Sequence, residues 1–326
     1  MDAATIVDEL LEWSIVGSFS RIGLAVRHLA FGWATIPDGS LEGRTALVTG
    51  PTSGLGRATT EALARLGARV ILVGRSPDRL AALRDELQEA YGGGRFPIVV
   101  ADMGSLASVR AAAAQILETE SRLDVLVDNA GAIHSERTVG PDGIEATLAT
   151  LVIGPFALVS SLLGLLRRTP GSRVVAVTSG GMYFQRLDLD DLQSEAEPFS
   201  GSRAYARAKR AQVALVREWA RHLGTGSVAI NAMHPGWADT PGLAESLPGF
   251  YQLMGPLLRT PAQGADTIVW LAATQAGRAR SGALYLDRRP RPFDRLPGTQ
   301  LSPSDRRRLW DAVVGLAGIP DPLPET

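Results

Sequence analysis

Tyr205 and Lys209, four residues apart, are the pair of side chains in this sequence with the clearest chemical potential. Both lie in a helical pattern over residues 202–223, and this spacing places their side chains on one face of a helix. A phenol ionises at about pH 10, too high for proton transfer at neutral pH, but a neighbouring ammonium favours the phenolate and lowers that pKa. The pair is therefore a candidate proton donor and acceptor.

Lys209 is the only lysine among 33 basic residues; the others are arginines. This bias indicates that a primary amine is needed at that position, with chance in an arginine-rich sequence as the alternative. A compact ammonium can lie beside both a phenol and a ribose, whereas a guanidinium is broad and planar. The same count excludes a phosphate-binding loop of the Gly-Lys-Ser/Thr type, because Ala208 precedes the lysine.

A hydroxyl group completes the candidate catalytic site. Ser179 directly follows the predicted strand over residues 174–178. In open parallel sheets, ligands bind at the carboxyl ends of the strands. We therefore expect Ser179 to hold a substrate oxygen close to the tyrosine.

A glycine-rich run joins the first predicted strand, residues 45–49, to a predicted helix over residues 54–66. The run reads Thr49-Gly50-Pro51-Thr52-Ser53-Gly54-Leu55-Gly56. Glycines let the backbone turn tightly and approach a pyrophosphate, whose charge meets the amino end of the helix. A purely structural turn is the alternative, but the strand–turn–helix context favours dinucleotide binding.

Arg75 bears on the choice of cofactor, because it follows the second predicted strand at Val73-Gly74. An acidic residue here would bind the ribose 2′-hydroxyl of NAD(H), whereas an arginine suits the 2′-phosphate of NADP(H). We therefore expect NADP(H), although a merely solvated arginine is the alternative. Asp102, after the third strand, either accepts a hydrogen bond from the adenine or caps the helix that begins near Ser105.

Strand and helix patterns alternate along most of the chain. Strand candidates are residues 45–49, 69–73, 98–101, 125–127, 174–178, 228–231 and 283–286, and helical patterns cover 54–66, 77–91, 105–120, 142–168, 202–223 and 262–275. The continuous apolar strands and the alternation predict an α/β fold with a doubly wound parallel sheet. We expect a single domain over residues 41–290, an N-terminal helical extension over 1–40 and a surface tail over 291–326.

The extension reads as one helix over residues 5–35. Its apolar stripe consists of Ile15, Phe19, Ile22, Val26, Leu29 and Trp33. Arg21, Arg27 and His28 interrupt the segment, which is therefore a poor membrane span. Packing against the rest of the protein is the first interpretation, and contact with a membrane surface is the second. Without the basic-then-apolar order of a secretory signal, we expect a cytoplasmic protein, with peripheral membrane contact as the alternative.

The composition excludes several classes of function. A net charge of −1 supplies no positive field for a nucleic acid backbone. The absence of cysteine excludes disulfides, thiolate metal sites and cysteine nucleophiles. The four histidines lack metal-ligand spacing, so we expect no metal site.

Five motifs occur in the order typical of one family. They are Thr-Gly-x-x-x-Gly-x-Gly at 49–56, Asn129-Ala130-Gly131, Ser179, Tyr205-x-x-x-Lys209 and Pro235-Gly236. Over residues 45–290 the chain resembles the short-chain dehydrogenases/reductases. The resemblance implies a seven-stranded Rossmann-like sheet and hydride transfer between NADP(H) and a carbonyl or alcohol.

The resemblance also implies a role for each motif. Tyr205 would be the acid/base, Lys209 would bind the phenol and the nicotinamide ribose, and Ser179 would bind the substrate oxygen. The residues expected to contact the cofactor are Gly50, Thr52, Ser53, Gly54, Leu55, Gly56, Arg75, Asp102, Met103, Asn129, Ala130, Gly131, Tyr205, Lys209, Pro235, Gly236, Trp237 and Thr240. The resemblance leaves monomer and homo-oligomer open.

One position departs from the family pattern. Many members carry an asparagine that holds a water in a proton relay to the lysine, and Leu151 stands there in this chain. This departure keeps a second interpretation open, in which the protein binds NADP(H) with little catalysis and has a structural or regulatory role. Apolar residues after the fifth and sixth strands predict a bulky hydrophobic carbonyl or alcohol as substrate, with ordinary packing within a lid as the alternative for several of them. They are Met182, Tyr183, Phe184, Trp237, Phe250, Tyr251, Leu253, Met254, Leu257 and Leu258.

Overall fold

An eight-stranded sheet forms the centre of the computed structural model, which describes residues 2–196, 198–224, 226 and 228–323. The strands lie in the order β3-β2-β1-β4-β5-β6-β7-β8. They are β1 (Thr45–Thr49), β2 (Arg69–Gly74), β3 (Ile98–Val100), β4 (Val125–Asp128), β5 (Ser172–Val177), β6 (Val228–Met233), β7 (Leu284–Leu286) and β8 (Arg289–Arg291). The first seven are parallel, which confirms the predicted doubly wound α/β sheet.

The eighth strand is a correction to the expected seven. β8 pairs antiparallel with β7, with Leu286 opposite Arg289, so Asp287 and Arg288 alone connect them. Both connecting residues have positive φ, 54° and 57°, as in the two-residue turns whose twist matches that of the strands. Because such turns usually contain Asn-Gly or Asp-Gly, the Asp-Arg pair is not recognisable as a hairpin in the sequence.

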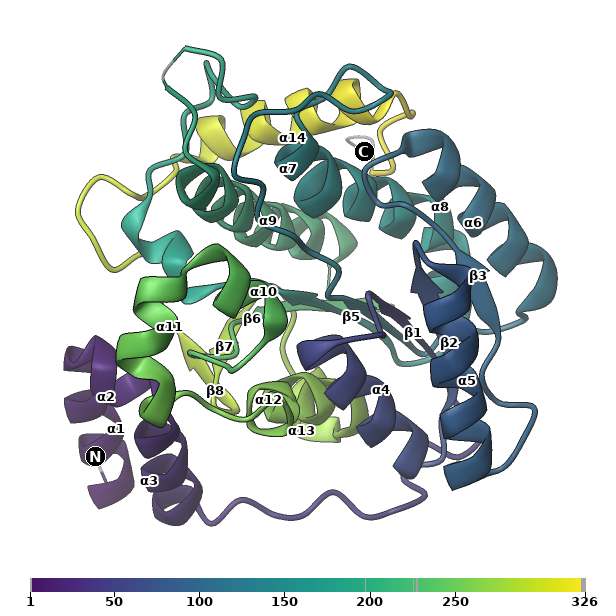
Figure 1. Cartoon of the computed structure of the whole chain (residues 1–326), viewed down its shortest axis with the longest axis horizontal. Helices are drawn as coiled ribbons and strands as arrows, with labels where there is room; N and C mark the ends of the chain where they lie inside the picture. Colours follow the sequence, from purple (N-terminus) through teal and green to yellow (C-terminus); the bar gives the residue numbers. More distant parts are fainter. Residues whose placement is uncertain (1, 197, 225, 227, 324–326) are drawn as a thin grey trace.

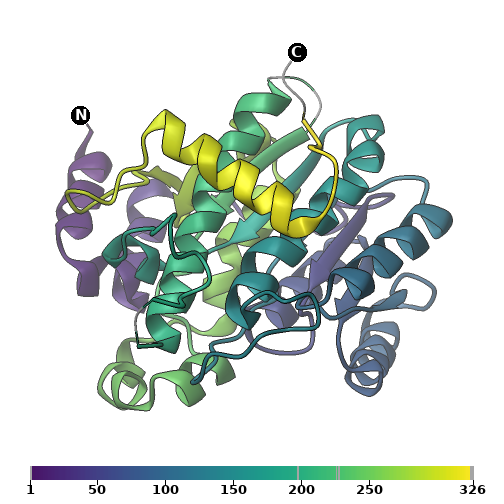
Figure 2. The same ribbon diagram turned by 90° about the horizontal axis from the view of Figure 1, so that it is seen from above.

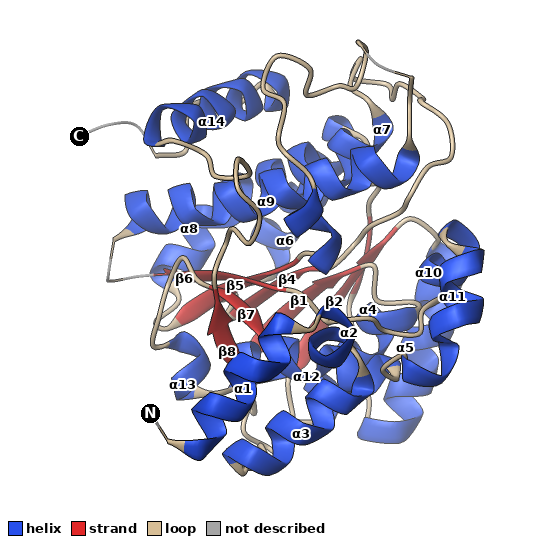
Figure 3. Cartoon of the chain, turned by 90° about the vertical axis from the view of Figure 1, so that its left-hand side faces the viewer, coloured by secondary structure: helices blue, strands red, loops and turns tan. Residues whose placement is uncertain are grey.

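Helices cover both faces of the sheet (Figures 1 and 3). One face carries α4 (Gly54–Arg65), α5 (Pro77–Tyr91), α12 (Pro261–Ala273) and α13 (Gln275–Arg278). The other carries α6 (Leu106–Thr119), α7 (Ala146–Leu148), the π-helical turn η1 (Ala149–Ile153), α8 (Gly154–Arg168) and α9 (Gly201–Leu223). Each face has its own buried hydrophobic cluster, because the strands are apolar on both sides.

Short helices follow the carboxyl ends of β5 and β6. They are η2 (Gly180–Phe184), α10 (Pro241–Ser246), α11 (Pro248–Met254) and η3 (Gly255–Leu257). Each belongs to a connection between parallel strands, and those connections meet at one edge of the sheet. They therefore form the surroundings of any ligand bound at that edge.

The N-terminal extension consists of three helices, not one. They are α1 (Ala3–Trp13), α2 (Ile15–Phe19) and α3 (Arg21–Phe31). Ser14 and Ser20 separate them in extended conformation, and Ser14 accepts a hydrogen bond from the N–H of Gly17 at the start of α2. A serine that caps a new helix interrupts the preceding one, which explains why a single periodic pattern is misleading here.

The predicted apolar stripe is not the buried face of these helices. Phe19 is buried, but Ile22 and Leu29 are exposed, Leu29 by 84%. Two charged side chains, Asp8 and Arg27, are also buried and are joined by an ion pair of 2.6 Å. The extension therefore buries charged side chains beside Phe19 and leaves most of its apolar stripe exposed.

The segment after residue 290 is not a surface tail. Helix α14 (Pro303–Ala317) lies across α8 and α9 (Figure 2), and Ser302 and Asp305 cap its first turn. Its Trp310 is fully buried, with ring centroids 5.0 Å from both Phe156 and Trp219. The Pro- and Arg-rich composition before α14 conceals this amphipathic helix. The division of the chain at residues 40 and 290 remains a prediction.

One continuous helical stretch, Ala146–Arg168, is long and apolar enough to cross a membrane by length and composition. Its most apolar window is 78% buried within the protein, between the sheet, α6 and α14. This burial is typical of a core helix.

Candidate active site

The candidate site lies where the strand order reverses, at the carboxyl ends of β1 and β4. β1 pairs with β2 on one side and with β4 on the other, so the connections after these strands diverge, and doubly wound folds bind ligands at such a point. The segment after β5, which begins Thr178-Ser179, reaches the same edge. Parallel strands thus assemble motifs that are separated by more than 100 residues in the sequence.

Ser179 and Tyr205 lie together at this edge. Ser179 is the N-cap of η2, where its hydroxyl accepts a hydrogen bond of 3.3 Å from the N–H of Gly181. Burial raises the pKa of Tyr205 to about 12, and a hydrogen bond with Ser179 acts in the opposite direction. The serine hydroxyl and the phenol therefore lie close enough to interact.

Lys209 lies one helical turn after Tyr205, with Nζ 5.8 Å from the centre of the tyrosine ring. Nζ donates hydrogen bonds to the carbonyl of Val177 at 2.6 Å and to Oε1 of Gln212 at 3.4 Å. Burial lowers the pKa of the amine to about 8, while the charge of Asp128 raises it. In this arrangement Ser179, not Lys209, lowers the pKa of Tyr205, so the expected effect of the ammonium on the phenol is not present.

The segment around Lys209 is fixed to the sheet. The hydroxyl of Thr178 donates to the backbone carbonyl of Lys209 at 2.9 Å. This bond joins the end of β5 to α9, and so sets the distance between Ser179 and the Tyr205–Lys209 face.

The glycine-rich turn requires glycine at defined positions. Gly50 has a φ of 65° and Gly54 a φ of 51°. At Gly56, a Cβ would lie 2.0 Å from the carbonyl oxygen of Gly50, so a larger residue would push α4 away from the turn. Thr240 lies across from this turn, 3.2 Å from the position of a Cβ on Gly54. The predicted pyrophosphate residues therefore face one another.

Asn129 supports the turn from the adjacent strand. Its amide nitrogen donates to the carbonyls of Thr49 at 2.9 Å and Gly50 at 3.2 Å. The hydroxyl of Thr49 in turn accepts from the N–H groups of Asn129 and Ala130. Next to them, a Cβ on Gly131 would lie 3.0 Å from the side chain of Leu151. The Asn-Ala-Gly motif therefore holds the β1 and β4 loops together.

The residues expected near the adenosine lie beyond β2 and β3. Arg75 is exposed directly after β2. Oδ1 of Asp102 accepts from the N–H of Gly104 at 2.9 Å, whereas Ser105 makes the N-cap of α6. Met103 is buried, and its carbonyl touches α8 at Gly154, where a Cβ would lie 2.0 Å away.

The loop after β6 carries Pro235, Gly236 and Trp237. Gly236 has a φ of 71°, and the backbone N–H of Trp237 donates to the carbonyl of Phe19 at 2.8 Å. This contact joins the loop to the N-terminal extension.

Sequence reasoning misses Phe19 as a contact of this site. Its ring is buried between η2 and the β6 loop, with centroids 4.8 Å from His234 and 5.9 Å from Trp237. A Cβ on Gly180, the residue after Ser179, would lie 2.5 Å from this ring. The apolar stripe signals a buried Phe19, but nothing in the sequence indicates where the ring is buried.

Sequence reasoning also misses Asp128 and Gln212, which lie beside Lys209. Nε2 of Gln212 donates to Oδ2 of Asp128 at 2.6 Å, and burial raises the pKa of this carboxyl to about 6. An aspartate at the end of an apolar strand is the one available signal.

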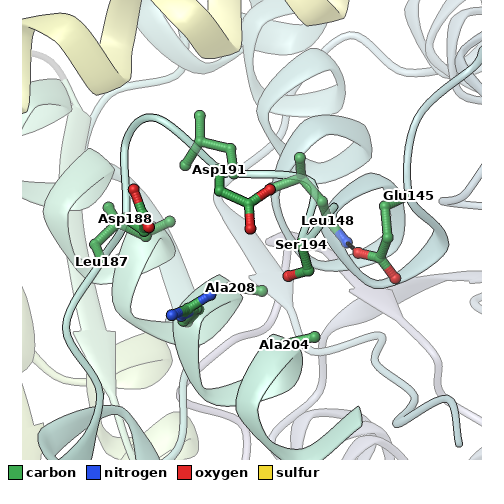
Figure 4. Close-up of a pocket in the computed structure, with 11 residues that line it drawn as sticks. Glu145, Leu148, Leu187, Asp188, Asp191, Ser194, Ala204 and Ala208 are labelled. Carbon is green, nitrogen blue, oxygen red and sulfur yellow. Dashed lines mark hydrogen bonds between the residues drawn. The ribbon is translucent and has the colours of Figure 1, made fainter. Parts of the chain in front are cut away.

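The pocket in Figure 4 is separate from this arrangement. It lies between the segment 187–194, α7 and the face of α9 that carries Ala204 and Ala208. Its lining residues are Glu145, Leu148, Leu187, Asp188, Asp191, Leu192, Ser194, Ala204, Arg207, Ala208 and Ala211. Since none of the predicted catalytic or cofactor residues lines it, it is not the predicted substrate pocket.

Known proteins resemble the chain over most of its length. Residues 44–248 match the family model described as "short chain dehydrogenase". Dehydrogenase/reductase SDR family member 12 from Bos taurus is 37% identical over 86% of this chain and 90% of its own length. Retinol dehydrogenase 14 from Mus musculus is 36% identical over 86% of this chain and 88% of its own length.

Solved structures share the fold. The Pseudomonas aeruginosa RhlG/NADP active-site complex is 27% identical, with a TM-score of 0.63 over 77% of this chain and 96% of that one. The motif order, the doubly wound sheet and the sequence matches agree, and the chain belongs to the short-chain dehydrogenase/reductase family of oxidoreductases.

Proposed function

We propose that this protein is an NADP(H)-dependent oxidoreductase that interconverts a hydrophobic carbonyl compound and the corresponding alcohol. The observation that carries the proposal is the proximity of Ser179 and Tyr205 at the carboxyl edge of the sheet, with Lys209 one helical turn away. A hydroxyl, a phenol and an amine at one point are the groups needed to orient an oxygen and exchange a proton with it.

The glycine-rich turn and its neighbours fit a dinucleotide. Ser53 makes no side-chain hydrogen bond as the N-cap of α4, so its hydroxyl and the first N–H groups of this twelve-residue helix suit a phosphate. Gly50 and Gly56 allow close approach to the backbone. We propose that the pyrophosphate is held by Gly50, Thr52, Ser53, Gly54, Leu55, Gly56 and Thr240, the adenine by Asp102 and Met103, and the nicotinamide half by Asn129, Ala130, Gly131, Tyr205, Lys209, Pro235, Gly236 and Trp237.

Arg75 supports NADP(H) over NAD(H). It stands at the end of β2, where the adenosine ribose lies in doubly wound folds, and no carboxylate occupies that position. Among the described residues it has no ion-pair partner, so a 2′-phosphate would not have to displace one. The Pseudomonas aeruginosa relative is described as an NADP complex.

In the proposed mechanism, NADP(H) supplies or accepts the hydride at the substrate carbon. Ser179 donates a hydrogen bond to the substrate oxygen and holds it beside Tyr205. During reduction, the phenol of Tyr205 releases its proton to this oxygen, and during oxidation the phenolate takes the proton back. Lys209, one helical turn away, would stabilise the phenolate with its positive charge and would hold the nicotinamide ribose.

A hydrophobic substrate is supported by apolar side chains on the short helices after β5 and β6. Phe250 on α11 packs edge-on against Trp237, with ring centroids 5.1 Å apart. Phe184 is half exposed at the end of η2, and Leu253 is 79% exposed on α11. One relative is named retinol dehydrogenase 14, and retinol is a bulky apolar alcohol.

We further propose a cytoplasmic protein that touches a membrane surface through the N-terminal extension. The exposed apolar side chains of its three helices are Ile6, Val7, Leu10, Trp13, Ile15, Val16, Ile22 and Leu29. Trp13 is 90% exposed, and an amphipathic surface that presents Trp and Leu is typical of interfacial binding. Vesicle sedimentation of the wild type and of a Leu10→Ser, Trp13→Ser, Leu29→Ser variant tests this; equal sedimentation would contradict it.

A second candidate function is cofactor binding with little catalysis. Leu151 favours it, because this apolar side chain cannot hold a water for the proton relay. One experiment decides between the two. The affinity for NADPH is first measured by fluorescence titration, and NADPH oxidation is then followed with a panel of aliphatic, isoprenoid and aromatic ketones and aldehydes. Tight NADPH binding without turnover of any compound favours the second candidate, and absence of NADPH binding contradicts both.

A further inference from the structure

Lys209 belongs to a buried chain of three side chains. Its Nζ donates to Oε1 of Gln212 at 3.4 Å, and Nε2 of Gln212 donates to Oδ2 of Asp128 at 2.6 Å. The three residues are only 3–6% exposed. They join α9 to the end of β4, directly before Asn129 of the cofactor loop.

The amide in the middle can face only one way. A glutamine side chain has one accepting and one donating end. Here the accepting end meets the ammonium and the donating end meets the carboxylate. Gln212 therefore transmits the attraction between two opposite charges that do not touch.

Asp128 is the charged group that acts on Lys209 in favour of the charged amine. Other titratable groups approach α9, but they have other partners. Tyr183 on η2 donates to a backbone carbonyl, Glu145 accepts from N–H groups of α7, and Arg306 on α14 pairs with a carboxylate on the outer side of α9. The residues of η1, which also packs against α9, do not titrate.

The position that holds a relay water in many family members supplies no polar group to Lys209 in this chain. η1 contains Leu151, which is fully buried and packs beside Gly131. Burial by itself favours the neutral amine, because a charged group loses hydration in the protein interior. A lysine in this place needs a nearby negative charge to stay protonated.

We propose that Asp128 is the counter-charge of Lys209: acting through Gln212, it keeps the buried amine protonated and fixed one helical turn from Tyr205. Asp128 and Gln212 are positioning residues, since neither would touch the substrate. The inference rests on the proposed oxidoreductase function for its purpose, but the coupling itself is a property of the cofactor-free protein.

The charges of the pair coexist over a limited pH range. Burial raises the pKa of Asp128 to about 6 and lowers that of Lys209 to about 8. Between these values the carboxylate and the ammonium are both charged, so the coupling operates near neutral pH. Above this range Lys209 loses its proton and can no longer stabilise a phenolate.

The lone lysine makes the test direct. Lysine labelled with ¹³C at Cε gives one side-chain signal in this protein, because Lys209 is the only lysine in the chain. Its chemical shift, followed by NMR from neutral to alkaline pH without cofactor, gives the titration midpoint. We expect Asp128→Asn to lower this midpoint by about one pH unit or more, as for loss of a nearby opposite charge.

Asp124→Asn is the matched control. Asp124 precedes β4, is buried as deeply as Asp128, and pairs with Arg44 and Arg122 rather than with α9. We expect this control to reduce stability without moving the Lys209 midpoint. An unchanged midpoint in Asp128→Asn, or an equal shift in Asp124→Asn, overturns the proposal.

A second variant covers the case in which Asp128→Asn does not fold. Gln212→Leu removes the bridge and leaves both charges, and should lower the midpoint by less than Asp128→Asn. An unchanged midpoint in this variant also overturns the proposal. Failure of NADPH binding would contradict the proposed function but would leave this titration result standing, so the two failures are distinguishable. With a substrate in hand, the alkaline limb of the single-turnover pH profile should shift in the same direction.

Discussion

Where the N-terminal extension meets the β7–β8 turn, buried charges contact opposite charges directly, whereas at the active site they meet through an amide. Asp287 accepts from Arg27 at 2.7 Å and from Arg259 at 2.6 and 2.9 Å. Asp128 has one oxygen bonded to Gln212, and its other oxygen has no hydrogen-bond partner among the described residues. The first cluster is closely paired, and the second is not.

This difference in pairing distinguishes charges that stabilise the fold from charges that serve the active site. Buried charges with complete pairing hold elements in place, and breaking one pair leaves an uncompensated partner. Buried charges with incomplete pairing have pKa values moved towards neutrality, which is common at catalytic sites. Lys209 and Asp128 show this behaviour, with values of about 8 and 6.

The largest expected effect concerns the site. Tyr205→Phe should slow hydride transfer from bound NADPH by about 10²–10⁴-fold, roughly 3–5 kcal/mol in the barrier, while NADPH remains bound. Lys209→Arg should not restore the rate, since a planar guanidinium cannot replace the amine between phenol and ribose. Single-turnover kinetics test both. Wild-type rates in Lys209→Arg would mean that the lone lysine is an accident of composition.

The next effect concerns the structural cluster. Arg27→Ala should reduce the free energy of unfolding by about 3–5 kcal/mol, because Asp8 and Asp287 lose a buried partner. Urea unfolding measures it. The control is Arg65→Ala, which breaks an exposed pair with Asp38 and should cost less than about 1 kcal/mol. Similar losses in both variants would remove the distinction between the two kinds of charge.

A smaller effect separates the two cofactors. Arg75→Ala should weaken NADPH binding by about 1.5–3 kcal/mol, since it removes a charge-assisted contact with the 2′-phosphate, and should leave NADH binding nearly unchanged. Fluorescence titration with both cofactors measures this. Equal affinities of the wild type for NADPH and NADH would contradict the preference.

The smallest effect near neutral pH is the response of stability to pH, and its sign differs between the regions. Arg291 and Arg27 outweigh burial and lower the pKa of Asp8, so its contribution is present above its ordinary value of 3.8 and is lost in acid. The pKa of Lys209 is lowered, so above about pH 8 the folded chain releases a proton that the unfolded chain keeps. Stability should therefore rise there, by at most about 1.4 kcal/mol per pH unit.

Urea unfolding of the wild type and of Lys209→Met across the alkaline range isolates this term. The variant should lose the alkaline rise and keep the acid loss. A rise of equal size in Lys209→Met would assign it to another group.

Local patterns are sufficient for the seven parallel strands and the motifs, but not for β8. The run at 49–56 is recognisable because its glycines are required by the local backbone geometry. The four-residue spacing of Tyr205 and Lys209 likewise places both side chains on one face of a helix. The partners of Lys209 could not be predicted in the same way, because Asp128 and Gln212 are 84 residues apart and meet only through the strand order.

The extension shows the same limit more strongly. A periodic apolar pattern indicates which side chains share a face, but it does not say whether that face points to the protein. Here the buried face is defined by Arg27 and Asp8, whose partners lie at the far end of the chain. Without knowledge of such distant partners, charged residues within a helical pattern are expected to be exposed to solvent.

The contact between Arg27 and Asp287, 260 residues apart, also sets an order of events during synthesis. The extension leaves the ribosome well before the β7–β8 turn that holds it. At a synthesis rate of about 5–20 residues per second, Asp287 is made roughly 13–52 seconds after Arg27. During that interval the three helices lack this part of their docking site, so the extension reaches its final position only after the β7–β8 turn has been made.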